Sequence, residues 1–400
     1  MTDLFWPGDH RAGETFSDAA FLAAMASVEN AWLGVLVDAG VAPAAARAEL
    51  AAVVAAGDAE AIAAAAEADG SPVTALLRLL RERTCGEAAR WLHRGLTSQD
   101  VVDTALMLCL RDAMSRVRSE IAAQVGTLVE LVETHQHTPM LARTLTQAAL
   151  PSTVGMKMVN WLAGVLDAAD VVKAVPQPSV QIGGAAGTMA AATELTGSAA
   201  AAVALSGRLA AALGLGDTVP WHTTRSAITR AGDALVTCCD AWGHLAADVA
   251  TGSRTEIAEL TEGHGGGSST MPHKNNPVLS VLIRRAALTA PSLAATLHTG
   301  SAVSVDERSD GGWHAEWATL RTLARRTVVA GAQTTELLSA LVVHTDRAAA
   351  NLAAAGDLLA EQRAMVELTG RTARSGYTGA TDHFIDAALQ RARHHLKETT

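Results

Sequence analysis

The chain has 400 residues, of which 49% are hydrophobic, 3% aromatic and 18% charged, and its formal net charge is -10. This length excludes a small disulfide-stapled peptide and is enough for two or three domains with buried cores. The acidic balance excludes the broad positive field that binds nucleic acids and anionic membranes. We therefore expect no nucleic-acid partner.

Alanine makes up roughly a fifth of the chain, well above its usual share. Alanine is the best helix former. The chain has one tyrosine, four phenylalanines and few alternating runs of valine, isoleucine and threonine. It therefore lacks the residues that favour the strands of a β-sandwich or barrel. These features predict an all-α protein.

The cysteines and the amino terminus indicate a reduced, soluble protein. Cys85, Cys109, Cys238 and Cys239 show neither CxxC spacing nor a secreted framework. The first residues carry acids and no apolar run of signal-peptide length, and even the alanine-rich run 189–205 is broken by polar residues. We expect a cytoplasmic protein with no membrane partner.

The first predicted elements are helical. Ser17 is placed to cap a helix that runs to about Asp38, and shorter helices follow. The turn HRGLTSQD at 93–100 then opens a helix of nearly forty residues. Thr97 and Asp100 have capping-box spacing at its start.

Further long helices are expected in proline-free spans at 152–174, 188–213, 223–260, 278–299 and 314–343. Helices this long and this rich in alanine predict an elongated central bundle. We expect a smaller helical N-terminal domain at 1–94, the bundle at 95–344 and a small helical C-terminal domain at 345–400.

The segment 261–277, TEGHGGGSSTMPHKNNP, interrupts the helical pattern and is either a flexible connector or a functional lid. Ser268 or Ser269 can act as a base or nucleophile if backbone N–H groups and Lys274 stabilise its alkoxide. Asn276 can hold a carboxylate. The segment lacks the phosphate-loop pattern, and its two histidines lack a third metal ligand.

Two further polar segments have both a structural and a functional interpretation. In HRGLTSQD, Thr97 or Ser98 can simply cap a helix and His93 can sit in a turn, or the helix start can bind a carboxylate. The segment 142–151, ARTLTQAALP, is expected to be a plain loop when it is considered alone.

Together these segments resemble the fumarase/aspartase superfamily, whose signature is GSSxMPxKxNP. Residues 267–277, GSSTMPHKNNP, match every fixed position, and the HRGLTSQDVVDTA and RTxxQ…P blocks precede them in the family's order. The resemblance implies a helical-bundle homotetramer with active sites built from three subunits and with no metal or organic cofactor. It also implies that Ser268 is the catalytic base and that Lys274 and Asn276 hold the substrate carboxylate.

Within the superfamily, the chain is most similar to the bacterial 3-carboxy-cis,cis-muconate cycloisomerases. The similarity lies in the amino-terminal GDHRAGETFSDAAF, in QIGGAAGT at 181–188, in PWHTTR at 220–225 and in DERSDGGWHAEW. It implies closure of a tricarboxylate diene to a lactone, 4-carboxymuconolactone, in protocatechuate catabolism. This closure is the reverse of a β-elimination.

One departure favours lactone chemistry. C–N lyases of the superfamily carry a general-acid histidine in the RTH block, where this chain has Leu145. A carboxylate, with a reference pKa of about 4, leaves as the anion without help, whereas an amine needs a proton. Asn275, where arginine is common, and Thr224, where glutamine is expected, leave the substrate open.

The implied substrate is a small anionic polycarboxylate. Three cations are expected to bind it, Lys274, Arg225 and Arg308. The expected neutral donors are Thr97, Ser98, Thr144, Gln147 and Gln181, and the expected histidines are His93 and His222. For each neutral residue alone, capping or core packing is the alternative. A fumarate-releasing C–N lyase and a crystallin-like structural protein remain the alternative functions.

Overall fold

The computed structural model describes residues 3–263, 265–267, 270–271, 274–374 and 376–399. The chain divides into two compact units. Unit 1 comprises Met1–Arg116, Val175–Asp233 and Ser292–Arg326, and unit 2 comprises Val117–Ala174, Ala234–Pro291 and Thr327–Thr400. This division differs from the boundaries expected near 94 and 344, because four long helices supply residues to both units.

Helices account for most of the described chain, as predicted. The helices shared by the two units are α5 (Ser98–His135), α9 (Ser226–Gly252), α10 (Val278–Ala302) and α11 (Gly311–Ser339). Unit 1 adds α1 (Asp18–Asp38), α2 (Asp58–Asp69), α3 (Pro72–Arg83), α4 (Gly86–Trp91), α7 (Ala190–Thr196) and α8 (Ala199–Leu213). Unit 2 adds α6 (Val154–Ala174), α12 (Thr345–Ala354), α13 (Ala360–Thr369) and α14 (Thr381–Thr399).

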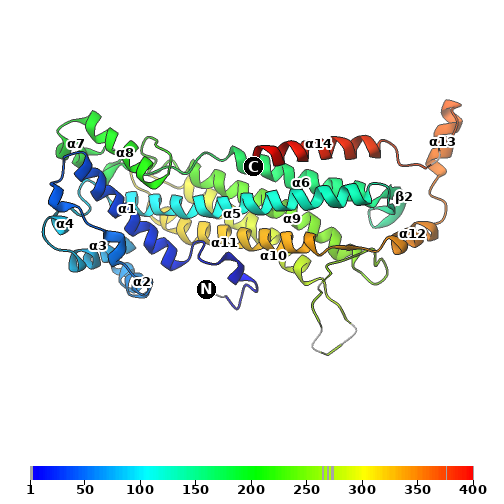
Figure 1. The fold of residues 1–400 in the computed structure, drawn as a ribbon, viewed down its shortest axis with the longest axis horizontal. Coiled ribbons are helices and arrows are strands. Elements are labelled where there is room, and N and C mark those ends of the chain that lie inside the picture. Colours follow the sequence, from blue (N-terminus) through cyan, green and yellow to red (C-terminus); the bar gives the residue numbers. More distant parts are fainter. Residues whose placement is uncertain (1–2, 264, 268–269, 272–273, 375, 400) are drawn as a thin grey trace. The chain divides into compact units, whose positions relative to one another are not determined.

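The first helix of unit 1 begins where the sequence predicts. The Ser17 hydroxyl accepts a hydrogen bond from the Ala20 N–H at 3.0 Å and so caps α1. Trp32, Leu33 and Leu36 on α1 are buried, and α1 packs against α8 (Figure 1). The core of unit 1 therefore forms around this helix.

Helix α5 confirms the prediction of a helix of nearly forty residues, because it has 38. At its start the Asp100 carboxylate accepts the Thr97 N–H at 2.9 Å, which is one half of the predicted capping box. In unit 2, α14 lies along α6 (Figure 1). The carboxyl-terminal segment is thus helical, as expected.

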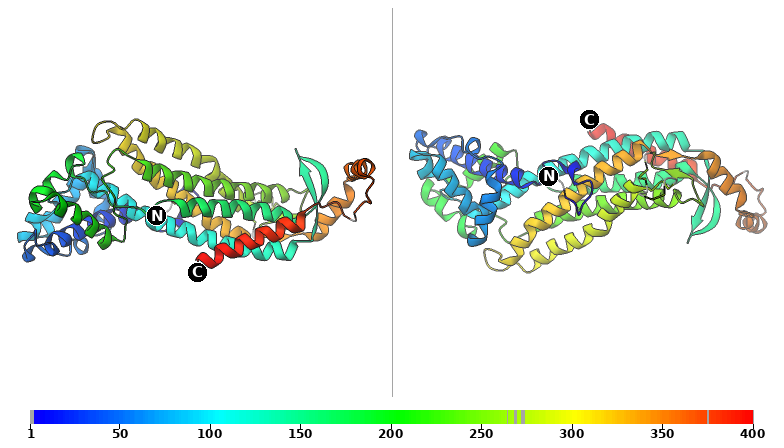
Figure 2. Two further views of the ribbon diagram at one scale, coloured as in Figure 1. Left: turned by 90° about the horizontal axis from the view of Figure 1, so that it is seen from above. Right: turned by 90° about the horizontal axis from the view of Figure 1, so that it is seen from below.

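The segment that precedes α6 corrects two predictions. The expected plain loop at 142–151 belongs to an antiparallel hairpin of β1 (Pro139–Thr144) and β2 (Gln147–Thr153), which projects from the helices of unit 2 (Figure 2). Helix α6 begins at Val154, and not at residue 152. Leu145 and Thr146 form the tight turn, with φ of 48° and 70°. A second small antiparallel pair joins β3 (Leu260–Thr261) and β4 (Val342–Val343).

Two helices of the described chain are long and apolar enough to cross a membrane by length and composition alone. They are α1, with 56% of its most apolar window buried inside the structure, and α10, with 33% buried. The bent pair α7 and α8 passes the same test only if it is counted as one span. In α1 the apolar residues fill the core of unit 1, whereas α10 leaves Val281 and Leu288 exposed.

Candidate functional site

The polar centre of unit 1 is organised around Asp100, whose side chain is fully buried. Its Oδ1 accepts the Gly183 N–H at 2.8 Å, and its Oδ2 accepts the Gly184 N–H at 3.0 Å as well as the Thr97 N–H. One carboxylate therefore joins the start of α5 to the glycine turn that follows Gln181. Backbone N–H donors of this kind satisfy a buried carboxylate.

Gln181 and His222, both predicted site residues, belong to the same cluster. The Gln181 side chain accepts the Trp221 N–H at 2.6 Å and lies 3.4 Å from Asp100 Oδ1. His222 Nε2 also lies 3.4 Å from Asp100 Oδ1. Within the part of the chain that the structure describes, His222 Nδ1 is buried and has no hydrogen-bond partner. This atom has capacity left for a ligand.

Arg225 does not present its charge to a ligand in this chain. Its guanidinium is buried and donates to Asp103 at 2.7 and 3.0 Å and to Glu316 at 2.7 and 3.0 Å. Burial opposes the charge of Arg225, but the two carboxylates outweigh burial and raise its pKa. Burial also raises the pKa of Glu316, and Arg225 offsets part of that rise. This geometry fits a structural ion cluster better than a substrate-binding cation.

The remaining candidates of unit 1 lie in the turn before α5 and in the segment before α11. His93 has a positive φ of 63°, and its Nδ1 lies 2.6 Å from Oε1 of the buried Glu29. The exposed Arg308 donates to the Thr97 hydroxyl, and Ser98 is the partly buried first residue of α5. Arg308 and Thr97 are thus brought together, as a joint binding role requires.

In unit 2, the ends of the signature segment are tied together. The Gly266 N–H donates to the Asn276 carbonyl at 2.9 Å and the Asn276 N–H donates to the Gly266 carbonyl at 2.8 Å. Gly266 is required there, because a Cβ would lie 2.2 Å from Val278 Cγ2. Lys274 is exposed and Asn276 is half-buried. Ser268, the proposed base, lies outside the described residues.

The base of the signature segment is held by a residue that the sequence analysis missed. The buried Glu262 accepts the Leu279 N–H at 3.0 Å and the Ser280 N–H at 2.6 Å. It therefore stabilises the first turn of α10, where a carboxylate is favoured by the helix dipole. Its position just before a glycine-rich run that leads to a helix is a signal that could have identified it.

The hairpin of unit 2 carries the last two candidates. Thr144 and Gln147 are exposed on either side of the turn, and Leu145 at the turn is 96% exposed. Arg143 behind them is held by the buried Glu259 through bonds of 2.8 and 3.0 Å. The hairpin therefore presents Thr144, Leu145 and Gln147 to solvent on an anchored base.

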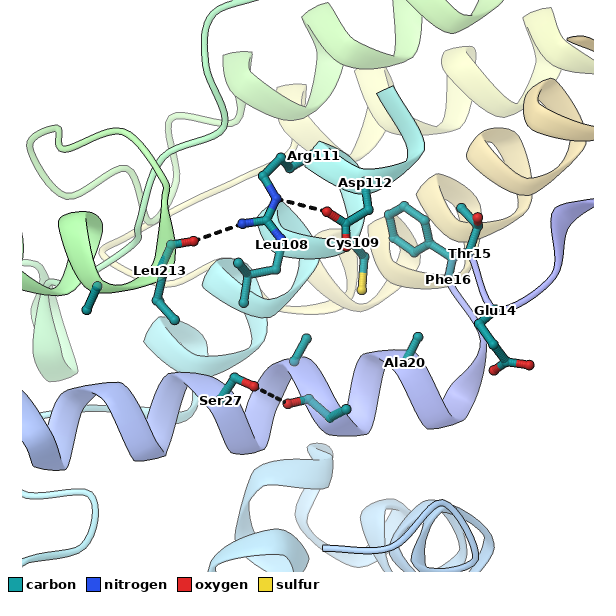
Figure 3. Close-up of a pocket in the computed structure, with 13 residues that line it drawn as sticks. Glu14, Thr15, Phe16, Ala20, Ser27, Leu108, Cys109, Arg111, Asp112 and Leu213 are labelled. Atoms are coloured by element: carbon teal, nitrogen blue, oxygen red, sulfur yellow. Dashed lines mark hydrogen bonds and ion pairs between the residues drawn. The ribbon is translucent and has the colours of Figure 1, made fainter. Parts of the chain in front are cut away.

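A cavity of about 680 Å³ in unit 1 is lined by residues such as Phe16, Cys109 and Arg111 (Figure 3). It lies against α1 and α5, and its Arg111 is occupied by the Leu213 carbonyl and the Asp112 carboxylate. None of the predicted site residues lines it. Among the described residues, no group of three His, Cys, Asp or Glu side chains is placed to hold a metal ion.

Comparison with known proteins identifies relatives that match most of this chain. Nitrosuccinate lyase of Streptomyces davaonensis is 40% identical over 371 residues, covering 88% of this chain and 77% of the relative. 3-Carboxy-cis,cis-muconate cycloisomerase of Bradyrhizobium diazoefficiens is 36% identical over 389 residues, covering 94% and 83%.

A solved structure is similar over almost the whole chain. The 3-carboxy-cis,cis-muconate lactonizing enzyme of Pseudomonas putida gives a TM-score of 0.82 at 31% identity, covering 95% of this chain and 85% of that chain. A family model described as "Lyase" matches residues 12–291. The chain therefore belongs to this lyase family, within the fumarase/aspartase superfamily.

Proposed function

We propose that the protein is a cycloisomerase that converts 3-carboxy-cis,cis-muconate to 4-carboxymuconolactone. The observation that carries the proposal is the similarity, over more than nine-tenths of the chain, to a cycloisomerase and to a lactonizing enzyme that act on this substrate. The substrate is a small anionic polycarboxylate. The signature GSSTMPHKNNP at 267–277 supports the same reaction class.

The reaction is an internal addition in which atoms and charge balance. One carboxylate oxygen bonds to an alkene carbon, and the π electrons move to the carbon next to another carboxylate. That carbon then takes a proton. We assign the proton transfer to Ser268, and the stabilisation of the developing negative charge to Lys274 and Asn276. No metal or organic cofactor takes part in this scheme.

The other binding residues follow from their surroundings. Arg308 and the Thr97 hydroxyl, together with His222, suit a second carboxylate, because they include a cation and, in the protonated ring of His222, an Nδ1–H without a partner among the described residues. The remaining proposed contacts are His93, Ser98, Thr144 and Gln147. Gln181 and Arg225 are assigned to holding the site together, since their polar atoms are already occupied by protein groups.

We also propose a cytoplasmic homotetramer with shared active sites. The apolar side chains of Val281 and Leu288 on α10 are 55% and 78% exposed in the single chain. These two side chains, seven residues apart on one helix, are where we place a contact with a partner subunit. Light scattering coupled to size exclusion tests the tetramer, and a monomer at micromolar concentration would refute it.

Elimination of nitrite from nitrosuccinate is the second candidate function. The observation in its favour is the 40% identity to nitrosuccinate lyase, higher than the 36% to the cycloisomerase. Leu145 fits this reaction too, because nitrite also leaves as a stable anion and needs no general acid. The product would be fumarate, which is the outcome expected of the C–N lyase alternative.

One pair of assays separates the two functions. The cycloisomerase removes the diene, so ultraviolet absorbance of 3-carboxy-cis,cis-muconate falls with time, and nitrosuccinate stays intact. A nitrosuccinate lyase releases nitrite and fumarate in equal amounts and leaves the diene unchanged. Folded protein that converts neither substrate would refute both functions and leave a C–N lyase of a succinyl adduct or a structural protein.

The role of Ser268 is tested by Ser268→Ala, with Ser269→Ala as the matched control. We expect the first variant to lose roughly 10²- to 10⁴-fold in kcat, the usual contribution of a general acid or base. Circular dichroism and oligomer size should stay unchanged. Retained activity in Ser268→Ala, or an equal loss in both variants, would place the proton transfer elsewhere.

A further inference from the structure

We propose that Asp100 is a positioning residue that holds His222 through its Nε2–H, so that the Nδ1–H of the protonated ring is directed at a substrate carboxylate. The inference rests on the proposed function, because it deepens the assignment of His222 to that site. It assigns Asp100 no contact with the substrate. Its effect passes entirely through the imidazole ring.

The first step is the charge of Asp100. A fully buried carboxylate needs donors, and Asp100 has three backbone N–H groups, from Thr97, Gly183 and Gly184. A carboxylate bound by these donors accepts hydrogen bonds and donates none. The ring nitrogen that faces Asp100 is His222 Nε2. That nitrogen must therefore carry the proton.

The second step is the state of the opposite nitrogen. Once Nε2 carries the proton, the neutral ring leaves a lone pair on Nδ1, and the protonated ring gives Nδ1 an N–H. Among the described residues Nδ1 has no hydrogen-bond partner, although it is buried. Burial of an unpaired polar atom is unfavourable. A substrate carboxylate would satisfy this atom when the imidazole is protonated.

The third step is the close packing that holds the ring. A Cβ at Gly183 would lie 2.8 Å from His222 Nε2, so the glycine turn touches the ring edge that faces Asp100. Gly187, at the other end of the turn, has a φ of 75°, and a Cβ there would lie 3.5 Å from Nδ1. Asp100 binds the N–H groups of Gly183 and Gly184 and so fixes this turn as well. The carboxylate thus positions both the ring and the turn that packs against it.

The experiment uses the full-length protein labelled with ¹⁵N-histidine. The His222 signals are assigned by their loss in His222→Gln. We expect the Nε2–H tautomer in the neutral ring of the wild type. Asp100→Asn should shift the population toward the Nδ1–H tautomer, because its amide can donate to Nε2. Because the neutral amide does not hold a protonated ring as a carboxylate does, kcat/KM for the diene should fall roughly ten- to a hundredfold.

Asp112→Asn is the matched control, because Asp112 lies on the same helix, is exposed and pairs only with Arg111 among the interactions found for its side chain. It should change neither the tautomer nor the kinetics. An Nδ1–H tautomer in the wild type would overturn the inference even if Asp100→Asn fails to fold. An Asp100→Asn variant with the wild-type tautomer and kcat/KM would also overturn it. Wild-type protein inert toward the diene would refute the proposed function alone, since the tautomer measurement needs no turnover.

Discussion

Arg225 and Asp103 form a two-point ion pair in unit 1 from which solvent is excluded, with Nη1 2.7 Å from Oδ2 and Nη2 3.0 Å from Oδ1. Glu316 binds the same guanidinium. Planar guanidinium and carboxylate groups suit such paired bonds. The guanidinium of Arg225, in the PWHTTR segment, is therefore already bound by two carboxylates of the same chain.

The ion pair predicts a large loss of stability on removal of one charge. Asp103→Asn leaves the buried Arg225 only partly neutralised, and we expect the free energy of unfolding to fall by about 3–5 kcal/mol. Urea denaturation at pH 7 measures this change. Asp112→Asn, at an exposed pair on the same helix, should stay within about 0.5 kcal/mol of the wild type. A similarly small effect for Asp103→Asn would contradict a structural role for the pair.

Leu145 predicts which leaving groups the enzyme accepts. It is 96% exposed and has a φ of 48°, a conformation that histidine and asparagine tolerate. Leu145→His should therefore fold normally and supply a general acid, so that fumarate release from a succinyl-amine adduct appears or rises about tenfold or more. Leu145→Asn suits the same backbone but has no acid, and it should show no gain. Equal behaviour of the two variants would show that position 145 does not control protonation of the leaving group.

The long helices could be predicted from the sequence because their caps and their apolar spacing are local signals. Ser17 and the Thr97–Asp100 pair mark two helix starts that the structure confirms. The hairpin was missed because its turn, at Leu145 and Thr146, has positive φ without the usual glycine or asparagine. Its strands also contain alanine and proline, which are rare in sheets.

The site could be predicted only in part, for a different physical reason. The candidates in turns, such as Thr97 and Arg308, were predicted from motifs. Asp100 and Glu316 act through burial and through contacts with residues distant in sequence. Neither property can be read from a single sequence. Arg225 was predicted to bind substrate because the sequence alone does not show its two carboxylate partners, Asp103 and Glu316.

Burial of three cysteines predicts how the protein responds to thiol reagents as pH rises. Cys109, Cys238 and Cys239 are buried, whereas Cys85 is exposed. Burial disfavours the charged thiolate, and it raises the pKa of Cys109 and of Cys239 to about 12. These groups should stay protonated as the pH rises from 7 to 9.

A disulfide reagent should therefore modify one thiol per folded chain across that pH range, and all four after denaturation. Cys85→Ser is the control and should leave no fast-reacting thiol in the native state. Modification of a second thiol in the folded protein, at a rate that increases with pH, would show that a buried cysteine is accessible.

The last prediction concerns Gly183. A side chain is excluded at this position by the packing of His222 against it, and not by a positive φ. The φ of Gly183 is -139°, outside the positive range that favours glycine. A Cβ there would nevertheless lie 2.8 Å from His222 Nε2 and 2.9 Å from Cε1. Gly183→Ala should displace the imidazole and lower kcat/KM about tenfold or more, with a loss of about 1–3 kcal/mol in the free energy of unfolding.

The matched substitution is Gly311→Ala at the start of α11, where an added Cβ meets no atom within 4 Å. That variant should keep full activity and gain up to about 1 kcal/mol, because alanine reduces the entropy of the unfolded chain. Steady-state kinetics and urea denaturation of both variants make the comparison. If Gly183→Ala retained wild-type kcat/KM, the position of His222 could not matter to the reaction. The ring would then be a packing element of unit 1, and the substrate carboxylate would have to be bound by other donors, such as Arg308 and Thr97.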